Sequence, residues 1–167
     1  MTAVVEAIFV TGAGGAPMRR VDEVRAIEGA GLEGDRYLSH QGYWSPLGDE
    51  CQVTLIEAEA LDEIEGRGLA LVKDGQHRRN IVVRGADLRA LAGHRFEVGE
   101  ALLAYDRPRP PCRYIASITE PTMTRALAAR RGGICARVVR SGIIRVGDEL
   151  VAQEGPVRPL NWLRRFG

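Results

Sequence analysis

The sequence is almost without lysine. Of its 23 basic residues 22 are arginine, and Lys73 is the only lysine in 167 residues. A single lysine leaves a single candidate for Schiff-base chemistry. The 22 Asp and Glu residues bring the net charge to +1, so the chain lacks the basic excess by which nucleic-acid-binding proteins neutralise phosphates. We therefore expect no nucleic acid partner, although the composition leaves room for local basic patches.

Cysteines are few, and long apolar runs are absent. Cys51, Cys112 and Cys135 are odd in number and far apart, which disfavours a disulfide framework and leaves at least one thiol free. There is no Cys-x-x-Cys pair and the three histidines are scattered, so the spacing of zinc ligands is missing. No apolar segment approaches the roughly 18–20 residues that span a bilayer, and the start of the chain does not resemble a signal peptide. We expect a cytoplasmic protein without a membrane partner.

What is present favours one globular domain over residues 1–167, with residues 153–167 as a C-terminal tail. Apolar residues are 45% of the chain and alternate more often than they repeat at helical spacing, which indicates many short strands. We expect helices at 57–65 and from Thr119 to Gly132-Gly133, and a long glycine-rich loop at 28–49. The expected strands are 4–10, 21–27, 52–56, 80–84, 94–98, 101–105, 134–139 and 143–146. Because helices do not follow each strand, the pattern predicts a mostly β fold, a closed or partly closed barrel with helices packed outside.

Cys112 is the strongest candidate for chemistry. It lies in a segment rich in proline and arginine, residues 107–113. Prolines fix the backbone and cannot extend a central strand, so we expect a stiff loop at the end or edge of a sheet. Nearby guanidinium groups favour the thiolate, which attacks electrophiles and binds soft metals. The alternative is a small core residue, which is our interpretation of Cys51 and Cys135 because they stand at or within apolar strands.

Two polar groups of residues are further candidates. His77-Arg78-Arg79-Asn80 precedes an apolar strand, and its guanidinium and amide groups can bind a phosphate or a planar heterocycle. A solvated basic turn is the alternative. In Gly34-Asp35-Arg36-Tyr37 the aspartate can orient the arginine or accept a hydrogen bond from a ligand, and a surface turn with an internal ion pair is the alternative.

In their order and spacing these segments resemble the MOSC family, the domain named after the C-terminal part of molybdenum cofactor sulfurases. The resemblance covers roughly residues 5–152, and the chain is similar to the short, stand-alone bacterial form of this domain. It is carried by Gly34-Asp35-Arg36-Tyr37, Val53 to Leu61, Arg78 to Gly85, Asp87-Leu88, Gly93, Val98-Gly99, Pro111-Cys112 and Gly142 to Asp148.

The resemblance implies a barrel-like β fold that binds the molybdenum cofactor, a pterin dithiolene with a phosphate tail. By their positions in the motifs, Cys112 is the implied catalytic residue and metal ligand, or carries sulfur, and Arg78 and Asn80 are implied cofactor contacts. Arg36 and Arg79 are further candidates for cofactor contacts. A soft thiolate suits molybdenum and arginine suits an anionic tail, so the implied roles agree with the chemistry of these residue types.

Two functions stay open. In the first, the protein is an oxidoreductase that reduces N-hydroxylated compounds at a molybdenum centre ligated by Cys112, with electrons from a separate reductase. In the second, it is a carrier or binding module that holds a persulfide or the cofactor on Cys112 and passes it from a donor to an acceptor protein. We do not expect pyridoxal phosphate, because the chain has no room for the fused sulfurase domain and Lys73 lies in a loop. The aromatic C-terminal tail leaves a homo-oligomer open.

Overall fold

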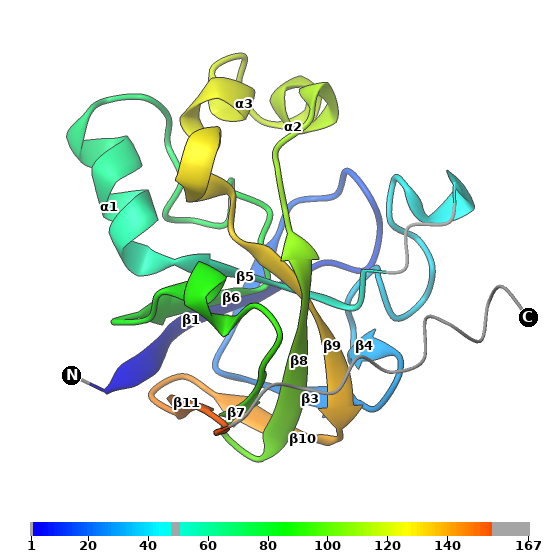
Figure 1. The fold of residues 1–167 in the computed structure, drawn as a ribbon. Coiled ribbons are helices and arrows are strands. Elements are labelled where there is room, and N and C mark those ends of the chain that lie inside the picture. The colour runs from blue at the N-terminus through cyan, green and yellow to red at the C-terminus, as the bar shows by residue number, and fades with distance from the viewer. Residues whose placement is uncertain (1, 48–50, 155–167) are drawn as a thin grey trace, which may run out of the picture.

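Seven strands close into a barrel in the computed structural model, which describes residues 2–47 and 51–154 (Figure 1). Their order around the barrel is β11-β7-β8-β9-β5-β6-β1, and β1 pairs back with β11. The barrel strands are β1 (Ala3–Val10), β5 (Val53–Glu57), β6 (Ile81–Arg84), β7 (Arg95–Val98), β8 (Ala101–Pro108), β9 (Ile134–Arg140) and β11 (Glu149–Ala152). The predicted mostly β, barrel-like fold is therefore confirmed.

Four further strands lie outside the closed ring. β2 (Arg19–Val21) pairs with the C-terminal part of β1, residues 8–10. β3 (Glu23–Ile27), β4 (Gly31–Leu32) and β10 (Gly142–Arg145) form a three-stranded sheet in the order β10-β3-β4. The single strand expected at 21–27 thus divides at Asp22, and its two parts join different sheets.

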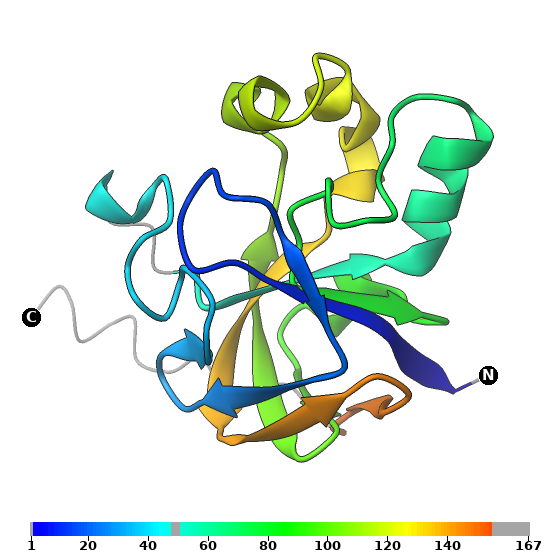
Figure 2. The same cartoon turned by 180° about the vertical axis from the view of Figure 1, so that it is seen from behind.

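The helices gather at the end of the barrel opposite the three-stranded sheet, as the two opposite views show (Figures 1 and 2). They are α1 (Ala58–Gly66), α2 (Arg113–Ile118) and α3 (Met123–Ala126), with 3-10 turns at Ser45–Leu47, Leu88–Leu91 and Ala129–Gly132. α1 connects β5 to β6, which run parallel, as a crossover helix does. No helix in residues 2–47 and 51–154 is long and apolar enough to cross a membrane.

In β1, β5 and β6, alternate residues face two separate apolar cores. In β5, Leu55 points into the barrel interior while Ile56 packs in the layer beneath the helices. In β6, Ile81 and Val82 divide in the same way. Because both of their faces are buried, β5 and β6 read in the sequence as short apolar runs.

The helix expected from Thr119 to Gly132-Gly133 is wrong. Thr119 is instead the residue that ends α2, and its hydroxyl donates to the Ile115 carbonyl. Pro121 disfavours helical backbone at the residue before it, so no helix runs through this point. Ala128, whose backbone is extended with φ of −68° and ψ of 173°, then separates α3 from the final 3-10 turn. The expected loop at 28–49 contains β4 and a 3-10 turn.

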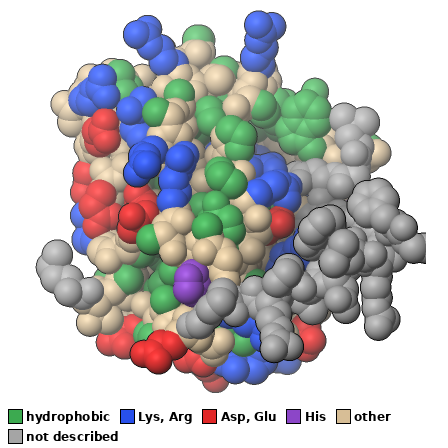
Figure 3. All heavy atoms as spheres, viewed as in Figure 1, with side chains coloured by type: hydrophobic (Ala, Val, Ile, Leu, Met, Phe, Trp, Pro, Cys, Tyr) green, Lys and Arg blue, Asp and Glu red, His purple; other side chains and the backbone are tan. Residues whose placement is uncertain are grey.

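The surface carries charges of both signs. On the face in Figure 3, acidic side chains gather at the left and along the bottom, while arginine side chains occupy the top. Most of the expected C-terminal tail, residues 155–167, lies outside the described part of the chain.

Candidate functional site

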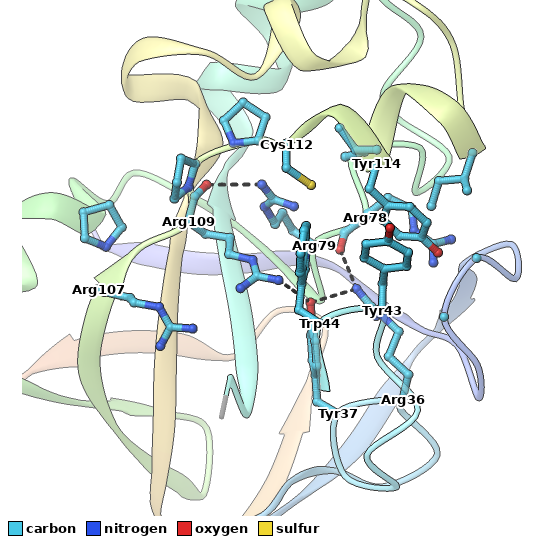
Figure 4. A pocket seen from close by; sticks show the side chains of 17 residues that line it. Arg36, Tyr37, Tyr43, Trp44, Arg78, Arg79, Arg107, Arg109, Cys112 and Tyr114 are labelled. Atoms are coloured by element: carbon cyan, nitrogen blue, oxygen red, sulfur yellow. Dashed lines mark hydrogen bonds between the residues drawn. The ribbon is translucent and has the colours of Figure 1, made fainter. Parts of the chain in front are cut away.

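A cavity of about 470 Å³ opens beside α2 (Figure 4). The segment that connects β8 to α2 forms one wall, and the loops around residues 14–15, 36–44 and 78–79 form the others. Five guanidinium groups and no carboxylate stand among the described residues that line it. They belong to Arg36, Arg78, Arg79, Arg107 and Arg109. The described lining of this cavity is therefore rich in cationic side chains, although the net charge of the chain is only +1.

Cys112 is placed in the wall of this cavity by the end of β8 and the start of α2. Its backbone is extended, with φ of −128° and ψ of 170°, and it is the last residue before the helix. Its carbonyl accepts hydrogen bonds from the Ile115 N–H at 3.2 Å and the Thr124 hydroxyl at 2.9 Å. The side chain is half-buried, and its sulfur points into the cavity (Figure 4). The structure thus brings Cys112 to the arginines, while its role as a metal ligand stays a prediction.

Arg36 is held rigidly against the cavity floor. Its guanidinium pairs with Asp35 Oδ1 at 3.1 Å, and the two side chains are 6% and 0% exposed. It also donates to the Tyr37 hydroxyl at 3.2 Å and to the Arg78 carbonyl at 3.1 Å, and it lies over the Tyr37 ring. Asp35 is fixed in turn by the Thr11 N–H at 3.2 Å. The ion pair is therefore internal, as the alternative interpretation had it, but it is buried beneath the cavity and not on a surface turn.

Arg78 has an unusual backbone. Its φ is 64°, a left-handed conformation that costs a side chain other than glycine on the order of 1 kcal/mol or more and often marks a functional site. Its guanidinium donates to the Ala16 carbonyl, and burial followed by the charge of Arg36 lowers its pKa. Arg78 also lines a second cavity of about 370 Å³. It therefore stands between two hollows of the molecule.

Arg79 is a buried cation that no described carboxylate neutralises. It donates to the carbonyl of Gly132 at 2.8 Å, that of Arg109 at 3.2 Å and that of His77 at 3.4 Å. Burial, and then the charge of Arg109, lower its pKa to about 10, so it remains charged at neutral pH. An uncompensated buried charge is costly, and a bound anion would offset that cost.

His77 and Asn80 are buried next to Arg78 and Arg79 and hold the segment that carries them. His77 Nδ1 accepts from the Arg79 N–H at 2.9 Å, and burial lowers the pKa of His77 to about 3. Asn80 does not line the cavity. Its Oδ1 accepts from the N–H and hydroxyl of Thr54, both at 3.0 Å, and its Nδ2 donates to the Phe9 carbonyl at 3.1 Å. The amide therefore joins β1 and β5 at the start of β6 and fixes the neighbouring arginines.

An aromatic rim that the sequence did not single out borders the cavity. Tyr43 stacks on Tyr114, with ring centroids 3.6 Å apart and planes 12° apart, and Trp44 meets Tyr43 edge-on at 4.8 Å. Tyr43 is 52% exposed. A stack between residues 71 positions apart leaves no local pattern in the sequence, so only the fold reveals it.

Cys51 and Cys135 are buried, in agreement with their interpretation as core residues. The sequence gives no sign that they touch. Their sulfurs lie 2.8 Å apart although 84 positions separate them, and Tyr37 packs with both. Arg109 Nη1 lies 3.8 Å from the sulfur of Cys135.

Comparisons with known proteins identify the family and agree with the fold. The sequence profile described as MOSC domain matches residues 43–151. A solved structure of the YuaD protein from Bacillus subtilis superposes with a TM-score of 0.75 and 21% identity, over 91% of this chain and 96% of that one. YiiM from Geobacillus stearothermophilus gives a TM-score of 0.70 and 19% identity over 91% and 75% of the two chains. YiiM from Escherichia coli gives 0.64 and 18% over 92% and 73%. No curated protein sequence matches significantly.

Proposed function

Because this chain belongs to the MOSC domain family, whose members are associated with the molybdenum cofactor, we propose that its cavity binds that cofactor and that Cys112 ligates the metal. The match over residues 43–151 confirms the family that the sequence motifs resemble. The observation that carries the proposal is the lining of the cavity, in which five arginines surround one cysteine without a carboxylate among the described residues.

The donor set fits the chemistry of the cofactor. A thiolate is a soft ligand suited to molybdenum, and Cys112 directs its sulfur into the cavity. The cofactor has an anionic phosphate, and guanidinium groups bind phosphates through paired, charge-assisted hydrogen bonds. Arg78 and Arg36 are the side chains that we assign to this anion. Arg79 adds positive charge to the same cavity, while the side-chain amide of Asn80 positions the segment before β6 that carries Arg78 and Arg79.

We further propose that the protein is an oxidoreductase for N-hydroxylated compounds. The reaction R–NHOH + 2 e⁻ + 2 H⁺ → R–NH₂ + H₂O breaks the N–O bond and requires an electron donor, which we propose is a separate reductase. When bound, the cofactor supplies a metal that exchanges electron pairs with the substrate. Tyr43, Tyr114 and Trp44 border the cavity and offer ring faces on which a planar substrate can stack.

The proposal is tested by expressing the full chain in a host that makes the cofactor and measuring molybdenum per chain. We expect stoichiometric metal in the wild type and its loss in Cys112→Ser. Arg78→Gln should lower the metal content severalfold, whereas Arg113→Gln should not. Arg113 is adjacent to Cys112 but exposed and outside the cavity lining, so it controls for the loss of one positive charge.

Activity then separates the two functions. Reduction of an amidoxime or a hydroxylaminopurine by the loaded protein, with a chemical electron donor, supports the oxidoreductase. Protein without molybdenum that carries a labile sulfane sulfur on Cys112 would identify a sulfur carrier instead. If neither group is found and Cys112→Ser changes only stability, Cys112 is a structural residue and both proposals fail.

A further inference from the structure

Cys51 and Cys135 lie behind the cavity wall and take no part in the proposed cofactor site. Cys135 is on β9, opposite Thr54 of β5, and Cys51 lies in the segment that leads into β5. The Cys51 thiol donates a hydrogen bond to the Cys135 sulfur, and the two sulfurs are 2.8 Å apart. A disulfide bond is about 2.05 Å long, so the sulfurs need to approach by less than about 1 Å to form one.

We propose that Cys51 and Cys135 are a peroxide-reactive dithiol that closes to a reversible disulfide, with Cys135 as the attacking thiol. This inference rests on the contact between the two sulfurs and on the groups around them. It does not depend on the cofactor.

The surroundings of Cys135 favour its thiolate. The hydrogen bond from Cys51 is the largest cause, and the charges of Arg109, Arg107 and Arg79 act in the same direction against burial. Together they lower the pKa of Cys135 to about 7. A thiolate is the nucleophilic form of cysteine, so Cys135 is suited to attack and Cys51 to resolve.

The two sulfurs lie close to the cavity, through which a small oxidant can approach them. Cys135 is fully buried and Cys51 is 4% exposed, but Tyr37 and Arg109 each line the cavity and contact the pair from its other side. A peroxide that enters the cavity is therefore separated from the sulfurs by these two side chains. Local opening of buried segments gives such a molecule access.

The chemistry balances with a peroxide as the oxidant. The Cys135 thiolate attacks one peroxide oxygen, the O–O bond breaks, and the released hydroxide takes up a proton to give water and a sulfenic acid on Cys135. The Cys51 sulfur then attacks the Cys135 sulfur, the S–S bond forms, and the sulfenic oxygen leaves as a second water. The two thiols lose two electrons and two protons in all, and an external thiol reverses the change.

Peptide mapping of the peroxide-treated full chain tests the inference. After reduction, removal of the reductant and exposure to hydrogen peroxide, we expect two of the three thiols to disappear. Trypsin without reductant should then release peptide 37–67 joined to peptide 132–137, and dithiothreitol should separate them. Peptide 96–113, which contains Cys112, should stay outside this cross-link.

Variants assign the attacking sulfur. In Cys51→Ser we expect oxidation to stop at a sulfenic acid on Cys135, which dimedone traps, whereas in Cys135→Ser Cys51 should remain reduced. Cys112→Ser is the matched control and should form the cross-link at the wild-type rate. The inference is overturned if the cross-link contains Cys112, or if the pair stays reduced in the folded wild type under conditions that oxidise it in the urea-denatured chain. That comparison needs no variant to fold.

Discussion

At the scale of single residues, the arginines of the cavity look alike in the sequence and differ in the structure. Arg36 and Arg107 each pair with the aspartate that precedes them. Arg79 uses three N–H groups on backbone carbonyls, which a lysine could not reach in this planar arrangement. Arg78 reaches the cavity from a left-handed backbone. The preference for arginine over lysine therefore has a structural reason in the cavity, because the planar guanidinium group can donate several hydrogen bonds at once, either to a ligand or to backbone carbonyls.

His77 makes the stability of the protein depend on pH. Its pKa falls from 6.5 to about 3 on folding, mainly through burial and then through Arg79 and Arg78. Between these values the unfolded chain binds a proton that the folded protein does not, so the free energy of unfolding decreases as pH falls below 6.5. We expect this residue to contribute a loss of up to about 1.4 kcal/mol per pH unit within that window.

Urea unfolding of the wild type and of His77→Gln between pH 7 and about 4 measures this contribution. The difference between the two proteins should shrink as pH falls, because glutamine does not titrate. His40→Gln, at an exposed position, should follow the wild type. A difference between wild type and His77→Gln that is constant with pH would contradict the low pKa of His77.

How far the site can be predicted depends on how local its signals are. The prolines and arginines around Cys112 are its sequence neighbours, and they predicted a loop at 107–113. The structure has the loop at 109–112, while Arg107 and Pro108 end β8 and Arg113 begins α2. Arg78 and Arg79 were found in the same way. The contact of Cys51 with Cys135 spans 84 positions, and it depends on the pairing of β5 with β9, which no short segment encodes.

At the scale of elements, the strands were predictable and one helix was not. Alternation predicts a strand such as β7, in which Phe96 and Val98 are buried while Arg95 and Glu97 are partly exposed. A short apolar run predicts β5, which lies between two apolar layers, as Leu55 and Ile56 show. The segment after Cys112 has no such regularity. There Pro121 interrupts the long helix that the apolar spacing of Met123 and Leu127 suggested. α2, which follows Pro111 and Cys112, was not predicted from the sequence.

The chain forms two short helices here, and a hydrogen bond from α3 holds Cys112, the residue before α2. The Thr124 hydroxyl of α3 donates to the Cys112 carbonyl at 2.9 Å. We expect Thr124→Val, which keeps the shape and removes the donor, to lower the free energy of unfolding by about 1 kcal/mol in urea titrations. Thr122→Val is the control, since Thr122 is exposed and makes no capping hydrogen bond. Equal unfolding midpoints for the two variants would show that this link does not hold the start of α2.

At the scale of the whole molecule, the net charge close to zero results from many charged side chains that are unevenly distributed. The balance of 23 basic and 22 acidic residues hides a cavity with five arginines and no described carboxylate in its lining. Acidic side chains instead occupy other parts of the surface (Figure 3). Such focusing in a concave site attracts anions even when the net charge is close to zero.

An inorganic anion should therefore stabilise the protein without any cofactor. A ligand that binds only the folded state at 100 times its Kd adds about 2.7 kcal/mol, which in a chain of this size raises Tm by roughly 5–10 °C. We expect pyrophosphate to produce such a rise in thermal unfolding of the wild type, and added sodium chloride to reduce it because salt screens the charges. Arg78→Gln should lose most of the rise, whereas Arg113→Gln should keep it, since only Arg78 lines the cavity. If the two variants respond alike, pyrophosphate binds elsewhere, and the positive lining of the cavity is not what selects its ligand.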